Sequence, residues 1–179
     1  MTAQAGDLIY IRGKAHPMAN DMEVKAPAMD WFDMQFIPSS TACWRGYEAT
    51  WRLKRNKLFL QDFSGLAEVR DKERFREEKG LLRQRMKRAE ITPVQYSRLL
   101  KQLQADLLQE VSVDMQFLFG SDQPVWAQWF NGFIRIPQGE MLMYRHAGYM
   151  SVFEAMQILQ FQDGVLIKSK VVDTGKYWR

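Results

Sequence analysis

The clearest pattern in the chain is an alternation of apolar and polar residues from Gly46 to Leu53. Such a two-residue period is typical of a half-buried β-strand. A second strand-like run, Lys57–Phe63, follows after Lys54-Arg55-Asn56. Asn accepts a positive φ, so this short link suits a turn, and the two runs predict a β-hairpin. The side chains expected on its apolar face are Tyr47, Ala49, Trp51 and Leu53.

Upstream of this hairpin the pattern is weaker. Asp7–Arg12 predicts one short strand, whereas Lys14–Asp33 holds two prolines and shows no clean period. We therefore expect Lys14–Asp33 to be mostly irregular and residues 1–66 to contribute mainly β-structure.

Residues 67–111 show helical spacing instead. Thr92, Pro93 and Gln95 have the order of a capping box with proline in the first turn, which predicts a helix start. A more polar helix is expected before it, at about Asp71–Arg88, and the short link between them predicts an antiparallel pair. The apolar positions that set the period of the second helix are Tyr96, Leu99, Leu100, Leu103, Leu107 and Val111.

The remainder of the chain returns to β-type patterns. Pro137 is expected to end a strand, and Asp163-Gly164 is a strong signal for a two-residue turn. The run Val125–Phe130 fits either a short helix or a strand. The predicted strands are 133–136, 141–145, 151–161 and 165–172.

These blocks predict a single domain over residues 1–179. Strands on both sides of a helical segment indicate an α+β fold, with a mainly antiparallel sheet. The segment 67–111 is then an inserted antiparallel helical hairpin.

Two segments resemble a family of small bacterial proteins of uncharacterised function. One is WRGYEATW within Cys43–Leu60, and the other is the WF-x-G-x-IRIP-x-G-x-x-L-x-Y-x-H-x-GY-x-S-x-x-E pattern within Val125–Asp173. The two lie in the family's order and span about half of the chain. The resemblance implies no reaction and no catalytic residues. The connection between the segments is longer here, so the basic helical hairpin looks like an elaboration.

The helical segment has a weaker similarity of its own. Leu81–Leu108 resembles the short SHOCT-type hairpin, in which a basic helix meets an IT-x-x-x-[FY] turn and a Leu-rich helix. This resemblance implies an interaction or oligomerisation module.

Composition narrows the class of protein. The chain has one cysteine, no apolar run long enough to span a membrane and no signal-peptide pattern, so we expect a cytoplasmic protein without a membrane partner. Nine Lys or Arg and four acidic residues fall within residues 70–88. The second half of this segment carries no acid, which makes phosphate contact an alternative function. The cations of that nucleic-acid interpretation are Arg83, Arg85, Lys87 and Arg88.

The sequence lacks the residue patterns that metal sites and phosphate-binding loops require, and it gives little support to a catalytic cysteine. The two histidines and the single cysteine have no metal-ligand spacing, so we expect no metal site and no cofactor. The glycines do not form a phosphate-binding motif. A Cys43–His146 dyad would require the two side chains to touch, and a free cysteine is more often a small buried apolar residue.

The strongest polar cluster surrounds His146. On an extended segment, Glu140, Tyr144 and His146 share one face, with Tyr149 and Glu154 beyond a bend. Such a cluster serves acid–base catalysis, ligand contact or structure, and without a nucleophile or metal the last two are favoured. A second cluster of aromatic and Arg residues precedes the first hairpin. The candidate binding surface is Trp44, Arg45, Tyr47, Glu140, Tyr144, His146, Tyr149 and Glu154.

The leading hypothesis is a bacterial binding protein that acts on a protein partner, with self-association as one form of that interaction. A toxin-neutralising (immunity) or phage-conflict role is expected by analogy alone. The alternatives are nucleic-acid binding through the basic helix, and a small-ligand or enzymatic site around His146.

Overall fold

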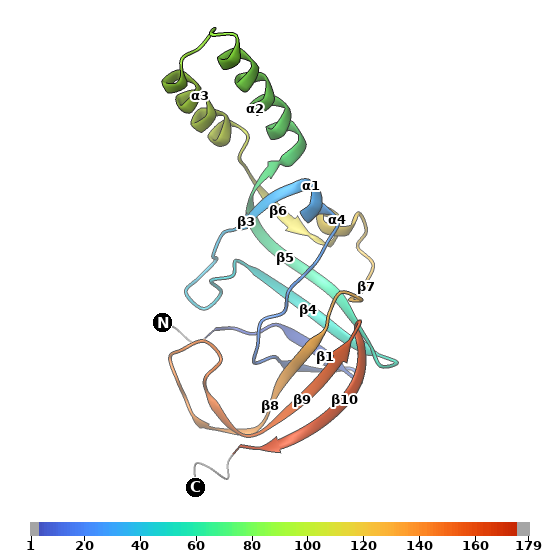
Figure 1. Ribbon diagram of the computed structural model, residues 1–179. Helices are drawn as coiled ribbons and strands as arrows, with labels where there is room; N and C mark the ends of the chain where they lie inside the picture. The colour runs from blue at the N-terminus through green and yellow to red at the C-terminus, as the bar shows by residue number, and fades with distance from the viewer. Residues whose placement is uncertain (1–3, 175–179) are drawn as a thin grey trace.

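A computed structural model describes residues 4–174 of the chain (Figure 1). Its strands form one ten-stranded sheet, with α2 and α3 lying outside it. In chain order the elements are β1 (Leu8–Ile11), β2 (Lys14–Pro17), α1 (Ala28–Trp31), β3 (Phe32–Phe36), β4 (Tyr47–Lys54), β5 (Lys57–Asp71), α2 (Lys72–Lys87), α3 (Pro93–Asp106), β6 (Gln109–Asp114), α4 (Met115–Phe119), β7 (Val125–Trp126), β8 (Gly132–Met143), β9 (Val152–Gln162) and β10 (Val165–Asp173).

The sheet is mostly antiparallel, as the sequence predicts, but it is mixed. Its main strand order is β2-β1-β4-β5-β10-β9-β8, and β3, β6 and β7 also pair with β5. The parallel pair is β1 with β4, which aligns Ile9 with Trp51 and Ile11 with Leu53. A pattern of alternation carries no strand direction, so this parallel pairing was not predicted.

The predicted β4–β5 hairpin is confirmed. Arg55 and Asn56 form its two-residue turn with φ values of 50° and 62°. Two positive φ angles in a row match the right-handed twist of the flanking strands. The alternation also predicts burial correctly, because Ala49 and Trp51 are buried and Glu48 and Arg52 are exposed.

Strand β5 extends further than its sequence suggests. It runs to Asp71, and its second half pairs with β3 on one side and β6 on the other. Residues 67–71, assigned above to the helical block, are therefore strand, as are residues 109–111 at the other end. Ala67 and Val69 are buried by these neighbours, a tertiary effect that overrides local helical spacing.

The two predicted helices are present between β5 and β6. Asp71 caps α2 by accepting a hydrogen bond from the Arg74 amide, and Thr92 and Gln95 form the expected capping box of α3. The helices contact each other and lie beyond the end of the sheet in Figure 1. No described residue of α2 is buried, and Leu103 is the buried residue of α3.

Two predicted strands merge into β8. The prediction that Pro137 ends a strand was wrong, because β8 continues from Gly132 to Met143 with Pro137 paired to Met156. β8 ends the main strand order, and an edge strand tolerates a residue without an N–H donor. The register shifts between Gln138 and Met141, where Gly139 adopts a φ of 75°. Tyr144 and His146 follow the strand and do not continue its alternation.

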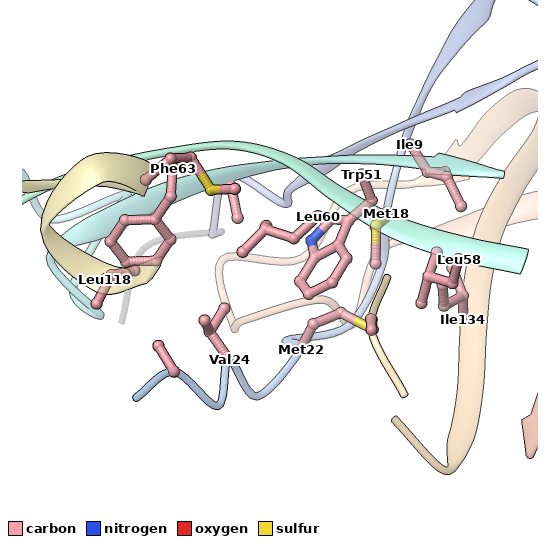
Figure 2. Packing of buried hydrophobic residues seen from close by; sticks show 14 of the residues in the cluster. Ile9, Met18, Met22, Val24, Trp51, Leu58, Leu60, Phe63, Leu118 and Ile134 are labelled. Carbon is pink, nitrogen blue, oxygen red and sulfur yellow. The ribbon is translucent and has the colours of Figure 1, made fainter. Parts of the chain in front are cut away.

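The segment predicted as irregular covers the core. It contains β2 and α1, and from Met22 to the start of α1 the buried residues Met22, Val24, Ala26 and Ala28 alternate with exposed ones. Figure 2 shows Met22 and Val24 beneath Trp51 and Leu60 of the sheet. The Trp129 indole and the Tyr47 hydroxyl donate hydrogen bonds to carbonyl oxygens of this extended segment.

The sheet curves, which brings residues after β2 against β8. The Ala19 amide donates to the Arg135 carbonyl at 2.8 Å, and the Arg135 amide donates to the Asn20 side chain. Asn20 also donates to the Phe133 carbonyl. Ile9, Trp51, Ile134 and Leu159 thus lie buried in one core cluster on the concave side of the curved sheet.

Candidate functional site

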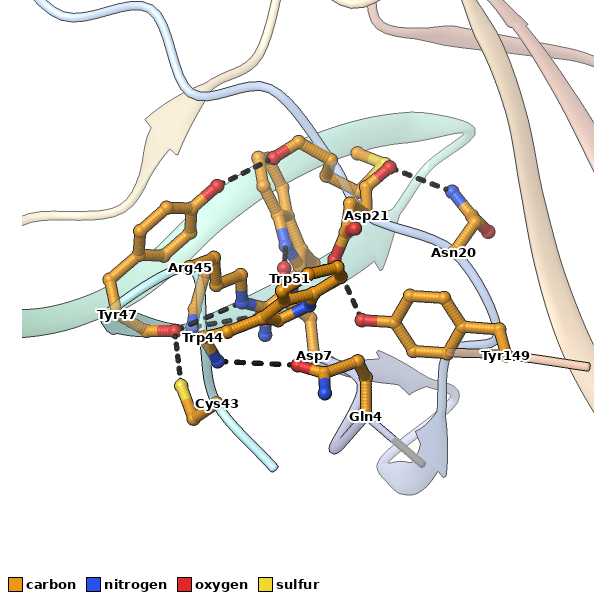
Figure 3. A network of polar contacts seen from close by, with 12 residues as sticks. Gln4, Asp7, Asn20, Asp21, Cys43, Trp44, Arg45, Tyr47, Trp51 and Tyr149 are labelled. Carbon is orange, nitrogen blue, oxygen red and sulfur yellow. Dashed lines mark hydrogen bonds and ion pairs between the residues drawn. The ribbon is translucent and has the colours of Figure 1, made fainter. Parts of the chain in front are cut away.

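A buried carboxylate organises the polar cluster drawn in Figure 3. Asp7 precedes β1, and its side chain is fully buried. Its oxygens accept hydrogen bonds from the Ala49 amide at 3.1 Å and the Trp51 indole at 3.0 Å. Asp7 is in phase with Ile9 and Ile11, so strand alternation directs it inward.

Arg45 links Asp7 to a second acid. Its guanidinium forms an ion pair with Asp7 and another with Asp21 at 3.0 Å. Its Nε donates to the Tyr47 carbonyl, and the guanidinium lies 5.1 Å from the centre of the Tyr47 ring. Only 12% of the Arg45 side chain is exposed. Its cation is thus neutralised inside the protein by two carboxylates.

Tyr149 closes the cluster from the C-terminal half. Its hydroxyl donates to Asp21 at 2.7 Å, and the neighbouring Gly148 carbonyl accepts from the Gln4 amide. The resulting set, Gln4, Asp7, Asp21, Arg45 and Tyr149, will be called the Arg45 network. The Arg45 network connects the N-terminal segment with three others, namely the segment around Asp21, the start of β4 and the loop before β9.

The titration of this network follows from its burial. Burial raises the pKa of Asp7, and the Arg45 charge and the bonds from Trp51 and Ala49 oppose that rise. Burial also raises the pKa of Tyr149, and the hydrogen bond to Asp21 adds to this effect because the carboxylate holds the phenol proton. Tyr149 is therefore a protonated donor at neutral pH, which suits a structural bond.

The structure places the other members of the predicted surface in separate positions. Tyr47 packs in the core, where its ring stacks on Phe63 at 4.9 Å. Trp44 is 57% exposed beside the Arg45 network, with its amide bonded to Gln4. Tyr144 and His146 contact each other edge to face at 4.6 Å in the loop after β8.

Glu140 and Glu154 belong to the irregular part of the β8–β9 pair. The Glu154 carboxylate accepts the Glu140 amide at 3.1 Å, next to the left-handed Gly139. This bond satisfies a donor that the register shift removes from the ladder. The predicted surface is therefore divided among the Arg45 network, the β8–β9 bulge and the 144–146 loop.

The four cations of the nucleic-acid interpretation do not act as one free group. Arg85 and Arg88 both lie near Glu90, at 3.7 Å and 3.9 Å. Arg83 and Lys87 are one helical turn apart on α2, whereas Arg85 lines the groove between the helices. Two of the four cations thus share an acidic neighbour, and the other two lie one turn apart on α2.

A groove of about 420 Å³ lies between α2 and α3. Its apolar wall is formed by Leu81, Leu82, Leu99 and Leu103, and Leu81 is 61% exposed. Glu78, Arg85 and Asp106 add both signs of charge along its sides. We call this surface the α2–α3 groove.

Sequence reasoning missed Asp7 and Asp21 as partners of Arg45. Asp7 carried one signal, an acid placed in phase with the apolar residues of the strand it precedes. Asp21 carried none, since its place beside Arg45 depends on the path of the 18–28 segment. In residues 4–174, no group of three or more His, Cys, Asp or Glu side chains is placed to hold a metal ion. Cys43 is buried and donates to the Tyr47 carbonyl.

Comparison with protein-family models, curated proteins and solved structures found no match to this chain. The resemblance to the small bacterial family therefore stays a prediction. None of the helices within residues 4–174 combines the length and apolar character that crossing a membrane requires.

Proposed function

We propose that this chain is a binding protein that holds a helical segment of a protein partner in the α2–α3 groove. The observation that carries this proposal is a leucine-lined groove, with Leu81 61% exposed, on a pair of helices that stands apart from the sheet (Figure 1). When a helix pair adds little to the hydrophobic core of its own protein, its apolar stripe usually becomes buried against a binding partner.

The architecture gives the groove a distinct place in the fold. We propose that α2 and α3 form an antiparallel hairpin inserted between β5 and β6, which pair directly with each other. The sheet and its core are complete without the helices, because the main core cluster contains no residue of α2 or α3. The hairpin is then free to present a surface.

The chemistry of the groove favours an amphipathic helix as its occupant. A helix in a groove buries residues spaced three or four apart, and the row of leucines supplies a matching apolar wall. Glu78, Asp106 and Arg85 offer partners to charges of either sign at its margins. A second copy of this hairpin satisfies the same requirements. If the protein has the immunity or phage-conflict role expected above, its partner is a toxin or phage protein that presents such a helix.

The proposal is tested by capturing partners from the native host with the tagged full-length protein and a Leu81→Asp variant. Burial of a leucine contributes about 1.5–3 kcal/mol, so a charge at position 81 lowers affinity by at least about tenfold. Val94→Asp is the matched control, because Val94 is 77% exposed on α3 and does not line the groove.

We expect one stoichiometric protein with the wild type and Val94→Asp, and its loss with Leu81→Asp. Light scattering of the purified proteins shows whether that partner is a second copy. Recovery of no stoichiometric partner, or equal recovery with Leu81→Asp, contradicts the proposal. Recovery of nucleic acid in place of protein supports the alternative based on Arg83, Arg85, Lys87 and Arg88.

A further inference from the structure

A second surface lies at the opposite part of the molecule, where the curved sheet opens beside the turns that follow β1 and β4. It is a hollow of about 560 Å³, a size typical of small-molecule sites. Four side chains that carry or can accept a positive charge line it, namely Arg12, Lys14, His16 and Arg55. We call it the basic hollow.

The strand register brings these four residues together. Ile11 pairs with Lys14 across the β1–β2 turn and with Leu53 across the β1–β4 pair. The turn that contains Arg12 therefore lies next to the turn that contains Arg55. His16 pairs with Ile9, which places it on the concave side with that buried residue.

Within the part of the chain that the structure describes, these four groups have no counter-charge. Among residues 4–174, the side chains of Arg12, Lys14, His16 and Arg55 make no hydrogen bond or ion pair, and no described acidic residue lines the hollow. The contrast with Arg45, which two carboxylates neutralise, is direct. Gathered cations without an acid raise the local positive potential and favour a bound anion.

The two arginines also occupy unusual backbone positions. Arg12 and Arg55 are the first residues of two-residue turns, and each has a φ of 50°. Asn, Asp and Gly are preferred at such positions because a Cβ group is crowded there. A long cationic side chain at both sites therefore runs against the local preference, as happens where function sets the residue.

The floor of the hollow is apolar. Ile11, Leu53, Leu159 and Leu166 line its inner part, next to the buried core. Gln157 and Ser169 add polar groups on β9 and β10, and the Gln157 amide donates to the Ser169 hydroxyl at 3.4 Å. A ligand that fits both regions has an anionic head at the turns and an apolar body on the floor.

We propose that the basic hollow binds a small amphipathic anion, with a carboxylate or phosphate head held by Arg12, Lys14, His16 and Arg55. The apolar part of the ligand rests on the leucine and isoleucine floor. This site is separate from the α2–α3 groove, so it holds or fails independently of the proposed protein partner.

Calorimetric titration of the full-length protein with dodecanoate below its micelle concentration tests this proposal. Dodecanol, inorganic phosphate and phosphatidylglycerol vesicles are the comparison ligands. The variant is Arg12→Asn/Arg55→Asn, which removes two charges and gives both turns a residue that prefers positive φ. The control is Arg52→Gln, since Arg52 is exposed on β4 and does not line the hollow.

We expect saturable 1:1 binding of dodecanoate, weaker binding of dodecanol, and an affinity loss of at least about tenfold in the double variant, as for lost charged hydrogen bonds. Arg52→Gln should bind within about twofold of wild type. A midpoint temperature of thermal unfolding (Tm) of the double variant that equals or exceeds that of the wild type confirms that the turns are intact. No binding of dodecanoate, equal binding of dodecanol, or unchanged affinity in the double variant overturns the proposal. Binding of vesicles without binding of monomeric dodecanoate also overturns it, and identifies a membrane-surface contact.

Discussion

At the scale of single residues, the central contact of the Arg45 network is the buried ion pair of Asp7 and Arg45. The carboxylate is fully buried and satisfied by three donors, one each from Ala49, Trp51 and Arg45. Arg45 forms ion pairs with both Asp7 and Asp21. A buried ion pair of this kind is of modest net benefit while intact, but removing one partner leaves the other charge uncompensated. The Arg45 network thus has a structural role, because its hydrogen bonds and ion pairs connect four segments of the chain.

The first prediction concerns Asp7→Asn. This change puts an amide NH₂ group among the donors of Ala49, Trp51 and Arg45, so at least one buried donor loses its acceptor, and we expect the free energy of unfolding to fall by about 3 kcal/mol. Urea denaturation measures the loss. The control is Asp33→Asn, which breaks an ion pair of Arg70 at a site where 47% of the Asp33 side chain is exposed. Exposed pairs contribute less than about 1 kcal/mol, so equal losses in the two variants would contradict the argument.

The second prediction is a pH dependence. Burial raises the pKa of Asp7 above its ordinary value of 3.8, so the folded protein binds this proton more tightly than the unfolded chain. The contribution of Asp7 to stability is then fully present below pH 3.8 and decreases as the pH rises through the folded pKa. The stability difference between wild type and Asp7→Asn should therefore shrink from pH 3.5 upward, as urea denaturation over about pH 3.5–8 would show. A difference that grows with pH would show that the Arg45 charge dominates instead.

At the scale of elements, the β8–β9 pair shows how one irregularity holds an acidic residue. Gly139 has a φ of 75°, and a Cβ there would lie 2.1 Å from the nearer Glu154 carboxylate oxygen. The glycine therefore serves both the backbone conformation and the close approach of Glu154. That approach lets Glu154 accept the Glu140 amide.

We expect Gly139→Ala to destabilise the protein by about 2–3 kcal/mol, since it combines backbone strain with the displacement of Glu154. Gly13→Ala is the matched control. Gly13 has a φ of 80° in the β1–β2 turn, but a Cβ there meets no atom within 4 Å. Its cost is then the conformational part alone, about 1 kcal/mol. Thermal or urea unfolding of both variants measures the difference, and equal costs would show that Glu154 is not held by this contact.

At the scale of the whole molecule, the structure combines a curved sheet that contains the core with a helix pair that adds almost nothing to it. The long strand β5 joins the two, since its first half lies in the curved sheet and its second half leads to α2. The basic hollow and the α2–α3 groove therefore lie on different parts of the fold, and the helices contribute no residue to the main core cluster.

This separation predicts that the helices can be removed. Replacing residues 72–106 with Asn-Gly leaves β5 and β6 paired and closes a much shorter loop, which offsets the few lost contacts. We expect a cooperative unfolding transition, with a free energy of unfolding within about 2 kcal/mol of wild type. Near-ultraviolet circular dichroism and urea denaturation measure this, and a molten or non-cooperative product would contradict it.

The sequence by itself determined the local elements whose signals are short in range. The Arg55-Asn56 and Asp163-Gly164 turns, the alternation of β4 and the Thr92–Gln95 capping box all depend on neighbouring residues, and all are present. The burial of Met22, Val24, Ala26 and Ala28 was not predicted, because this segment was expected to be irregular and most of it has no strand partners.

Only the tertiary structure decided which residues form a site. Arg45 and Tyr149 were singled out from the sequence, yet their partner Asp21 is 128 residues away from Tyr149 along the chain. Arg12 and Arg55 meet because β1 pairs in parallel with β4, and a one-dimensional pattern does not encode strand direction or neighbours. Long-range pairing is set by the combined burial of the whole core, so the grouping of distant polar residues follows from the complete fold.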